Sequence, residues 1–383
     1  MQPELIPLCE PDVGEDEISA VADAIRSGWL TAGPKVREFE AAFAAVLGDG
    51  VEAVSVSSAT AGLHLALAAQ GIGPGMRVAV PTYTFASTAQ VVRHTGADVV
   101  FVDSRADDYE VDLDALVDAG RAADAVMPVH FAGRAYDLEA LAARLPEGVK
   151  VVDDAAHAFT ASGSSGPVGR QPSDATVFSF YANKTMTTGE GGMLVTRNPE
   201  LAARARVMRT HGIERDAYAR FRTSSPDAWR YAVVAEGYKY NFTDPQAAMG
   251  LVQLGKATRM RDARERIALR YAEELADLPL DLPLLPAPGQ RHAWHIYVIG
   301  VRDEAAVDRD ELARSLTREG IGISVHYTPL HMHPLWAESM NLRPEDFPNA
   351  RRHAKRALTI PLSSRMTDDQ VDRVVRAVRG ALS

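Results

Sequence analysis

The stretch VFSFYANKTMTTGEGGMLVT, residues 177–196, opens with an apolar run typical of a buried strand and continues into Lys184 and a group of glycines. A lysine directly after a strand, flanked by small and hydroxyl residues, is placed for covalent amine chemistry. Burial and nearby positive charge would lower its pKa, which that chemistry requires. The alternative is an exposed lysine at a turn, and the rest of the chain decides between the two.

Short apolar runs alternate with helix-like segments upstream of this stretch. The runs are VEAVSV (51–56), RVAVP (77–81), DVVFVD (98–103), DAVMPVHF (124–131) and VKVVDDA (149–155). This rhythm predicts βαβ units, and therefore an α/β fold with a mostly parallel sheet between layers of helices. Ligands of such sheets gather at the carboxyl ends of the strands.

Helical periodicity and prolines mark the remaining elements. Pro34 opens a helix with an apolar stripe, and Gly48 closes it; the stripe is Val36, Phe39, Phe43 and Val46. A long helical segment follows YNFTDPQAAMG and runs to about Leu278, where LPLDLPLLPAPGQR (278–291) breaks any regular element. We take this Pro-rich segment as a hinge between a large domain, residues 1–250, and a smaller C-terminal α/β domain, residues 251–383.

The C-terminal part contains further candidate elements. HAWHIYVIGV (292–301) and GISVHYTPL (322–330) resemble strands, and DRDELARSLTREG (308–320) a helix. Thr367 and Gln370 have capping-box spacing at the start of the last helix, whose stripe is Val371, Val374, Val375 and Val378.

Composition excludes several classes of protein. The 383 residues exceed what one hydrophobic core usually serves, and the formal net charge of -10 argues against nucleic-acid and anionic-membrane partners. The single cysteine, Cys9, cannot form an internal disulfide and fits a reducing compartment. The start of the chain does not resemble a signal peptide, and no apolar run approaches the ~18 residues of a membrane helix. We expect a cytoplasmic protein.

Residues 55–67, SVSSATAGLHLAL, predict a phosphate site. A strand ends here in hydroxyl residues and passes into a helix, so Ser58, Ala59 and Thr60 would offer backbone N–H groups and hydroxyls to an anion. A simple Ser/Thr helix cap is the alternative.

Residues 150–159, KVVDDAAHAF, place two carboxylates at the end of an apolar strand. A buried carboxylate needs a cation, and the protonated nitrogen of a pyridoxal ring is one. Asp153 and Asp154 point to opposite sides of a strand, so only one of them should face such a ring. Asp154 and His157 also suggest a metal site, but no further ligands lie nearby in the sequence.

Two more side chains suit the same cofactor. Ser179, five residues before Lys184, is a second candidate phosphate donor. Phe85, in VPTYTFAST at 80–88, follows a strand end and could stack on a flat ring; core packing explains it equally well.

These motifs, in this order and together with GYKYNFTDPQAAMGLVQL at 237–254, resemble the DegT-type (DegT/DnrJ/StrS) nucleotide-sugar aminotransferases of PLP fold type I. The resemblance covers essentially the whole chain. The opening segment, PVHFAG, AAH and HAWH most resemble enzymes that make 4-amino sugars of the 4-amino-4-deoxy-arabinose type.

The resemblance implies a role for each matching residue. Lys184 would carry pyridoxal 5'-phosphate (PLP) on its amine and move the proton in catalysis, while Asp154 would pair with the ring nitrogen. The other implied cofactor contacts are His157 and Phe85 at the ring, Ala59, Thr60 and Ser179 at the phosphate, and Asn241 at the phosphate of the neighbouring subunit's cofactor. A homodimer with shared active sites follows.

Substrate contacts are also implied. Relatives carry an arginine where this chain has Thr243, so the contact with the donor's carboxylate is open; Lys239 is a possible substitute, or a solvated side chain. The implied sugar-side residues are Trp29, Leu30 and Thr31 in one loop, and His326 and Tyr327 in another. Trp29 could equally be packing, and the Arg-rich run at 204–222 is either a diphosphate contact or a solvated helix face.

The resulting prediction is a transaminase that cycles between PLP and pyridoxamine phosphate (PMP). It would take an amino group from an amino acid, such as L-glutamate, and transfer it to a keto group of a nucleotide-diphosphate keto-deoxysugar. The keto group at C4 is the first candidate. Two alternatives remain. A PLP-dependent sugar dehydratase on the same scaffold resembles this family with histidine in place of the lysine. A non-catalytic regulatory homologue would have lost cofactor residues, which are all present here.

Overall fold

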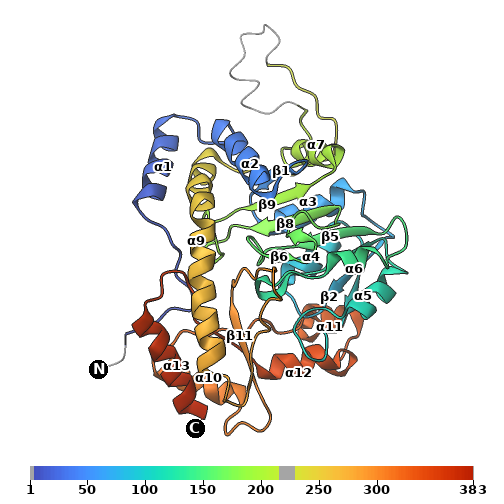
Figure 1. Cartoon of the computed structure of the whole chain (residues 1–383). Coiled ribbons are helices and arrows are strands. Elements are labelled where there is room, and N and C mark those ends of the chain that lie inside the picture. The colour runs from blue at the N-terminus through green and yellow to red at the C-terminus, as the bar shows by residue number, and fades with distance from the viewer. Residues whose placement is uncertain (1–3, 215–228, 383) are drawn as a thin grey trace.

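A seven-stranded sheet forms the centre of the larger part of the molecule, as a computed structural model of the chain shows (Figure 1). The structure describes residues 4–214 and 229–382. The strand order is β1-β9-β8-β5-β4-β2-β3, and every neighbouring pair is parallel except the two pairs made by β9. The predicted α/β class with a mostly parallel sheet is therefore confirmed. The strands are β1 (Glu52–Val56), β2 (Arg77–Pro81), β3 (Asp98–Val102), β4 (Ala125–Val126), β5 (Lys150–Asp154), β8 (Ala175–Ser179) and β9 (Gly192–Thr196).

Helices cover both faces of this sheet. One face packs on α3 (Ala59–Ala69), α4 (Ala86–His94) and α7 (Pro199–Met208). The other face packs on α2 (Pro34–Leu47), α5 (Leu113–Gly120), α6 (Leu138–Ala142) and the first half of α9 (Asp244–Glu274). Because apolar side chains project from both faces of the strands, the strands read as nearly continuous hydrophobic runs in the sequence.

A second hydrophobic cluster lies around a three-stranded antiparallel sheet. Its strands are β10 (Leu280–Asp281), β11 (Tyr297–Val301) and β12 (Ala357–Ile360), and α10 (Arg309–Arg318), α13 (Asp368–Leu382) and the second half of α9 pack on it. Helix α9 runs past both sheets without a break (Figure 1). It therefore continues through residue 250, where the sequence placed a domain boundary; the division into two domains stays a prediction.

Shorter elements complete the described chain. They are α1 (Glu15–Arg26), the two-stranded β6 (Ser162–Gly163) and β7 (Gly166–Pro167), α11 (Pro334–Met340), α12 (Pro348–Arg356) and three short 3₁₀ turns, η1 (Phe131–Gly133), η2 (Leu330–Met332) and η3 (Pro344–Asp346). None of the helices in the described ranges is both long and apolar enough to cross a membrane.

Several expected elements differ from the structure. GISVHYTPL forms no strand, because its backbone makes only isolated bridges, such as that of Ser324 with Thr359. In HAWHIYVIGV only Tyr297–Val301 is a strand, and the Pro-rich segment contains the short strand β10. Helix α9 ends at Glu274, before Leu278.

The predicted side-chain patterns of two helices can be compared with the structure. On α2, Val46 is exposed and Leu47 is buried in its place. The last helix follows its prediction: Thr367 and Gln370 exchange hydrogen bonds, Thr367 N–H to Gln370 Oε1 at 3.0 Å and Gln370 N–H to Thr367 Oγ1 at 3.3 Å. Its four valines are buried.

Candidate active site

A cavity of about 430 Å³, here called the lysine cavity, opens at the carboxyl ends of the parallel strands. Strand β5 ends in Asp154 and β8 ends in Ser179, five residues before Lys184. The described residues around the cavity are Ser58, Ala59, Thr60, Thr84, Phe85, Ser87, Val129, Asp154, Ala156, His157, Ser179, Tyr181, Asn183, Lys184, Glu190, Gly191, His295, His326 and Tyr327. Ten of the residues that the sequence singled out thus lie together.

Lys184 is half-buried in the lysine cavity. Burial lowers the pKa of its amine to about 8, although Asp154 and Cys9 act in the opposite direction. Its Nζ lies 3.4 Å from Nε2 of His295. A part of the amine is therefore unprotonated at neutral pH, and only an unprotonated amine can attack a carbonyl or accept a proton.

Asp154 is 4% exposed, and burial raises the pKa of its carboxyl. Thr88 donates its hydroxyl to Oδ2 at 2.8 Å, and the backbone N–H of Ala156 donates to Oδ1 at 3.1 Å. Asp153 points the other way, as expected, and binds Nε2 of His130 at 2.8 Å. A cation placed beside Asp154 would offset the cost of keeping its carboxylate buried.

Three histidines line the lysine cavity together with the amine; His157 and His295 are buried, and His326 is partly buried. Burial lowers the pKa of His157 and of His295 well below the usual range, and lowers that of His326 to about 4. The Tyr327 hydroxyl lies 3.0 Å from Nε2 of His157, and His326 Nδ1 lies 2.8 Å from the Thr359 hydroxyl. All three rings are neutral at pH 7, so Lys184 carries the positive charge of this cluster.

The start of α3 fits both interpretations of SSATAG, the helix cap and the phosphate site. Ser58 is the helix cap, because its Oγ accepts the Ala61 N–H at 3.1 Å. Ser58, Ala59 and Thr60 all line the lysine cavity, so the Ser58 hydroxyl and the first N–H groups of the helix are available there as donors. Gly192 lies against this turn: a Cβ there would be 2.7 Å from the backbone nitrogen of Ala59. The chain is thus closely packed around a place suited to an anion.

Phe85 lines the lysine cavity with 59% of its surface exposed. Its ring centroid lies 6.0 Å from that of Tyr327. Core packing, the alternative for this residue, is therefore wrong: the ring is open to a flat partner.

The lysine cavity fits PLP. Its volume lies in the range of small-molecule sites, and it combines an amine, a buried carboxylate, an open aromatic face and a helix N-terminus. Among the residues that the structure describes, no group of three or more His, Cys, Asp and Glu side chains is arranged to hold a metal ion.

The remaining candidates lie outside the lysine cavity. Asn241 pairs through its backbone with Val56, and its side chain accepts a hydrogen bond from Lys239, which is exposed. Thr31 accepts the backbone N–H of Asp244 at 3.2 Å. Trp29 donates its indole N–H to the backbone oxygen of Ala32 at 3.0 Å, and Leu30 is exposed.

The Arg-rich run at 204–222 falls partly outside the described residues, from position 215 on. Within its described part, Arg206 pairs with Glu52 at 2.8 Å and Arg209 pairs with Glu40 at 2.5 Å. These two guanidinium groups therefore already have carboxylate partners.

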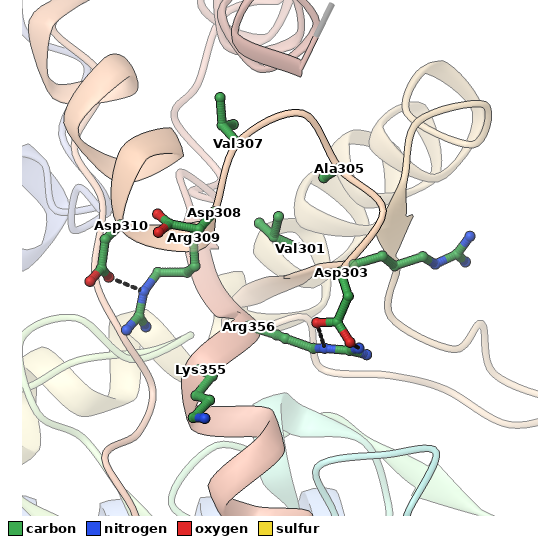
Figure 2. A pocket seen from close by; sticks show the side chains of 10 residues that line it. Val301, Asp303, Ala305, Val307, Asp308, Arg309, Asp310, Lys355 and Arg356 are labelled. Carbon is green, nitrogen blue, oxygen red and sulfur yellow. Dashed lines mark hydrogen bonds and ion pairs between the residues drawn. The ribbon is translucent and has the colours of Figure 1, made fainter.

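A second cavity, of about 420 Å³, lies between β11, the turn before α10 and the end of α12 (Figure 2). Its three arginines have carboxylate partners: Arg356 with Asp303, Arg309 with Asp310 at 2.5 Å, and Arg302 with Asp281 at 2.7 Å. It includes none of the residues singled out from the sequence, so the lysine cavity is the candidate site.

Sequence reasoning missed two polar partners in this site. Thr88 lies within a quoted motif but showed no sign of binding Asp154. His295 belongs to HAWH, 111 residues from Lys184. No local spacing relates residues that far apart.

Comparison with known proteins identifies the family of this chain. Residues 11–379 match the model of the DegT/DnrJ/EryC1/StrS aminotransferase family. The chain is 44% identical over 381 residues to the spore coat polysaccharide biosynthesis protein SpsC of Bacillus subtilis, covering 98% of this chain and 96% of SpsC.

Solved structures are similar as well. The putative sugar aminotransferase Spr1654 of Streptococcus pneumoniae, in its PMP form, superposes with a TM-score of 0.90 at 29% identity over 98% of this chain and 97% of its own. Helicobacter pylori PseC, an aminotransferase involved in the biosynthesis of pseudoaminic acid, gives a TM-score of 0.89 at 25% identity over 99% of both chains.

Proposed function

Because the chain belongs to the DegT/DnrJ/EryC1/StrS aminotransferase family and is a PLP-dependent sugar aminotransferase, we propose that it moves an amino group from L-glutamate to the C4 keto group of a nucleotide-diphosphate keto-deoxysugar. One observation carries the proposal: the Lys184 amine and the Asp154 carboxylate line one cavity together with the N-terminus of α3. The similarity to SpsC supports a sugar as the amino acceptor.

Each half of the reaction uses the same side chains. When bound, PLP supplies an aldehyde that takes up the amino group and a protonated ring that withdraws electrons from the reacting carbon. Lys184 removes the proton from the α-carbon of the amino acid, and in the second half it delivers a proton to the sugar carbon. A pKa of about 8 suits this double role, because the amine can both accept and return a proton near neutral pH.

The neighbouring side chains hold the reactants. Asp154 keeps the proton on the ring nitrogen, supported by its bonds from Thr88 and Ala156. Ser58, Ala59, Thr60 and Ser179 would hold the phosphate of the cofactor, and Phe85 and His157 would hold its ring. We assign the sugar side to His326 and Tyr327, which line the same cavity.

We further propose a homodimer in which each site uses Asn241 of the second copy. Asn241 lies outside the lysine cavity of its own chain, and its side chain accepts a hydrogen bond from the exposed Lys239. Trp29, Leu30 and Thr31 would then meet the partner's sugar, and Lys239 the carboxylate of the donor. Exposed apolar side chains on and after α1, Ile18, Ile25 and Leu30, supply surface for such a contact.

The acceptor can be identified directly. The purified protein is loaded with PMP and offered a panel of 3-keto and 4-keto sugar nucleotides on uridine and thymidine diphosphate. We expect the absorbance of PLP to return only with a 4-keto sugar. Return with 3-keto sugars alone would refute the C4 assignment, and loss of a sugar hydroxyl without a gained amine would indicate a dehydratase.

Shared sites can be tested by mixing two inactive variants. Dimers of Lys184→Ala and of Asn241→Ala each lack one component at both sites. A mixed dimer contains one site with both Lys184 and Asn241 if the sites are shared, so mixing should restore activity. Absence of recovery, with subunit exchange shown by sedimentation of tagged chains, would refute the shared site.

A further inference from the structure

A third, very small cavity of about 10 Å³, here called the rear cavity, shares Asn183, His295 and His326 with the lysine cavity. Its walls come from the N-terminal segment, the residue before Lys184, the two histidine segments and β12; they are Leu8, Cys9, Asn183, His295, Ile296, His326, Thr359, Ile360 and Leu362. A space of this size holds about one water molecule.

Two of the residues that line the rear cavity each have a buried polar atom with no hydrogen-bond partner among the described residues. These atoms are Nδ1 of His295, a residue only 3% exposed, and Oδ1 of Asn183. Leaving a buried polar atom unpaired costs about 1–3 kcal/mol, so such atoms usually bind water when space allows. One of these atoms can donate and the other accepts, which is the pair that one bridging water satisfies.

The other nitrogen of His295 faces the catalytic amine. Nε2 lies 3.4 Å from Nζ of Lys184, a long hydrogen bond of the kind that tightens when an active site is occupied. The ring is neutral, so it carries a single proton, and the position of that proton decides which group donates.

The two tautomers have opposite consequences for Lys184. A proton on Nε2 would donate into the lone pair of the amine, the same electron pair that must accept a proton from the substrate. A proton on Nδ1 leaves Nε2 as an acceptor, which binds one amine hydrogen and keeps the lone pair available.

We propose that His295 is a positioning residue for Lys184, held in its Nδ1–H tautomer by one ordered water that also binds Oδ1 of Asn183. The water accepts from His295 and donates to Asn183, and Nε2 then accepts a hydrogen from Lys184. This proposal rests on the proposed role of Lys184 as the proton carrier.

The tautomer and the water can be observed in the cofactor-free protein, without turnover. We expect nitrogen NMR of labelled histidine to show the His295 proton on Nδ1, with the signal assigned by its loss in His295→Gln. A crystal structure should show one water within hydrogen-bond distance of both Nδ1 and Asn183 Oδ1. A proton on Nε2, a charged ring or an empty rear cavity would overturn the proposal.

The coupling to Lys184 can be measured through the amine itself. The only other lysines in the sequence are Lys35, Lys150, Lys239, Lys256 and Lys355, so labelled lysines give few signals to titrate by NMR. His295→Leu removes the acceptor, and because a hydrogen bond favours the charged amine, the pKa of Lys184 should fall by roughly 0.5–1 unit. His295→Gln, which restores an acceptor, should return the pKa towards the wild-type value.

The control is His292→Asn, a change in the same segment that lacks contact with Lys184. Nδ1 of His292 accepts the Trp294 N–H at 2.8 Å, and the asparagine oxygen can replace it. An unchanged Lys184 pKa in His295→Leu would show a purely structural role. If His295→Leu does not fold, the tautomer of His295 in the wild-type protein tests the proposal on its own. Failure of the sugar panel alongside the expected tautomer would refute the proposed function and leave this inference standing.

Discussion

The hydroxyl of Thr88 donates a hydrogen bond to Oδ2 of Asp154 over 2.8 Å, and so connects the first turn of α4 to the carboxyl end of β5. The two residues lie 66 positions apart in the chain. This bond favours the ionised carboxylate against the effect of burial, which raises the pKa of Asp154. Thr88 therefore supports the charge that is to hold the cofactor's ring.

Replacing Thr88 by valine should weaken PLP binding. Thr88→Val keeps the shape of the side chain and removes the donor, so the carboxylate becomes harder to ionise. A hydrogen bond to a charged group contributes about 1.5–3 kcal/mol, which corresponds to an affinity loss of roughly tenfold or more. Absorbance titration with PLP measures this loss. Thr88→Ser, which keeps the hydroxyl, is the control; equal affinities of the two variants would contradict the role of the bond.

The pKa of Lys184 predicts how covalent PLP attachment depends on pH. Only the neutral amine reacts, and with a pKa of about 8 its fraction is about a tenth at pH 7 and levels off above pH 8. The attachment rate, followed by visible absorbance, should show that inflection. Asp154→Asn should move it to lower pH, since Asp154 raises the pKa of Lys184. Lys184→Arg should show no attachment. A rate that still rises at pH 10 would point to an exposed lysine.

Much of the fold can be predicted from the sequence because parallel strands buried on both faces leave continuous apolar runs. Strands β1, β2, β3 and β5 all fall within such runs. GISVHYTPL also contains residues that favour strands, yet its backbone makes only isolated bridges, because strand formation depends on a neighbour that lies far away in sequence. Short strands such as β10 leave no periodic pattern at all.

In the candidate site, too, some residues could be placed from the sequence and others could not. Asp154, Ser179 and Lys184 could be placed together from sequence, because the ends of neighbouring parallel strands meet at one edge of a sheet. Thr88 and His295 could not, because their bonds to this group join segments from separate parts of the fold. Residues that act across a dimer interface are harder still to place from sequence, because they belong to the site of another chain. The role of Asn241 therefore stays a prediction.

Acid should destabilise the protein in part through His292. Burial lowers the pKa of this ring to about 3, while in the unfolded chain it is about 6.5. The unfolded state therefore binds the proton first, and stability present above pH 6.5 is lost as the pH falls towards 3. At pH 5 the loss from this residue is about 2 kcal/mol.

The test is the variant His292→Asn, which keeps the acceptor for Trp294 and removes the titrating group. Its free energy of unfolding in urea should fall less than that of the wild type between pH 7 and pH 5. Parallel curves for the two proteins would show that His292 is protonated in the folded state as easily as in the unfolded chain.

Gly192 should tolerate no side chain. A Cβ at this position would lie 2.7 Å from the nitrogen of Ala59, 2.8 Å from the carbonyl carbon of Ser58 and 2.9 Å from the oxygen of Phe178, all of them backbone atoms that cannot rotate away. Gly192→Ala must therefore shift β9 or the start of α3. We expect a loss of about 1–3 kcal/mol in the free energy of unfolding, and weaker competition by inorganic phosphate against PLP.

The matched control is Gly380→Ala in α13, where a Cβ meets no atom within 4 Å. Because alanine favours a helix over glycine, this variant should keep phosphate binding and gain up to about 1 kcal/mol of stability. The two substitutions add the same methyl group, so any difference in phosphate binding comes from its position. Unchanged phosphate binding in a folded Gly192→Ala protein would place the anion elsewhere than at the first turn of α3.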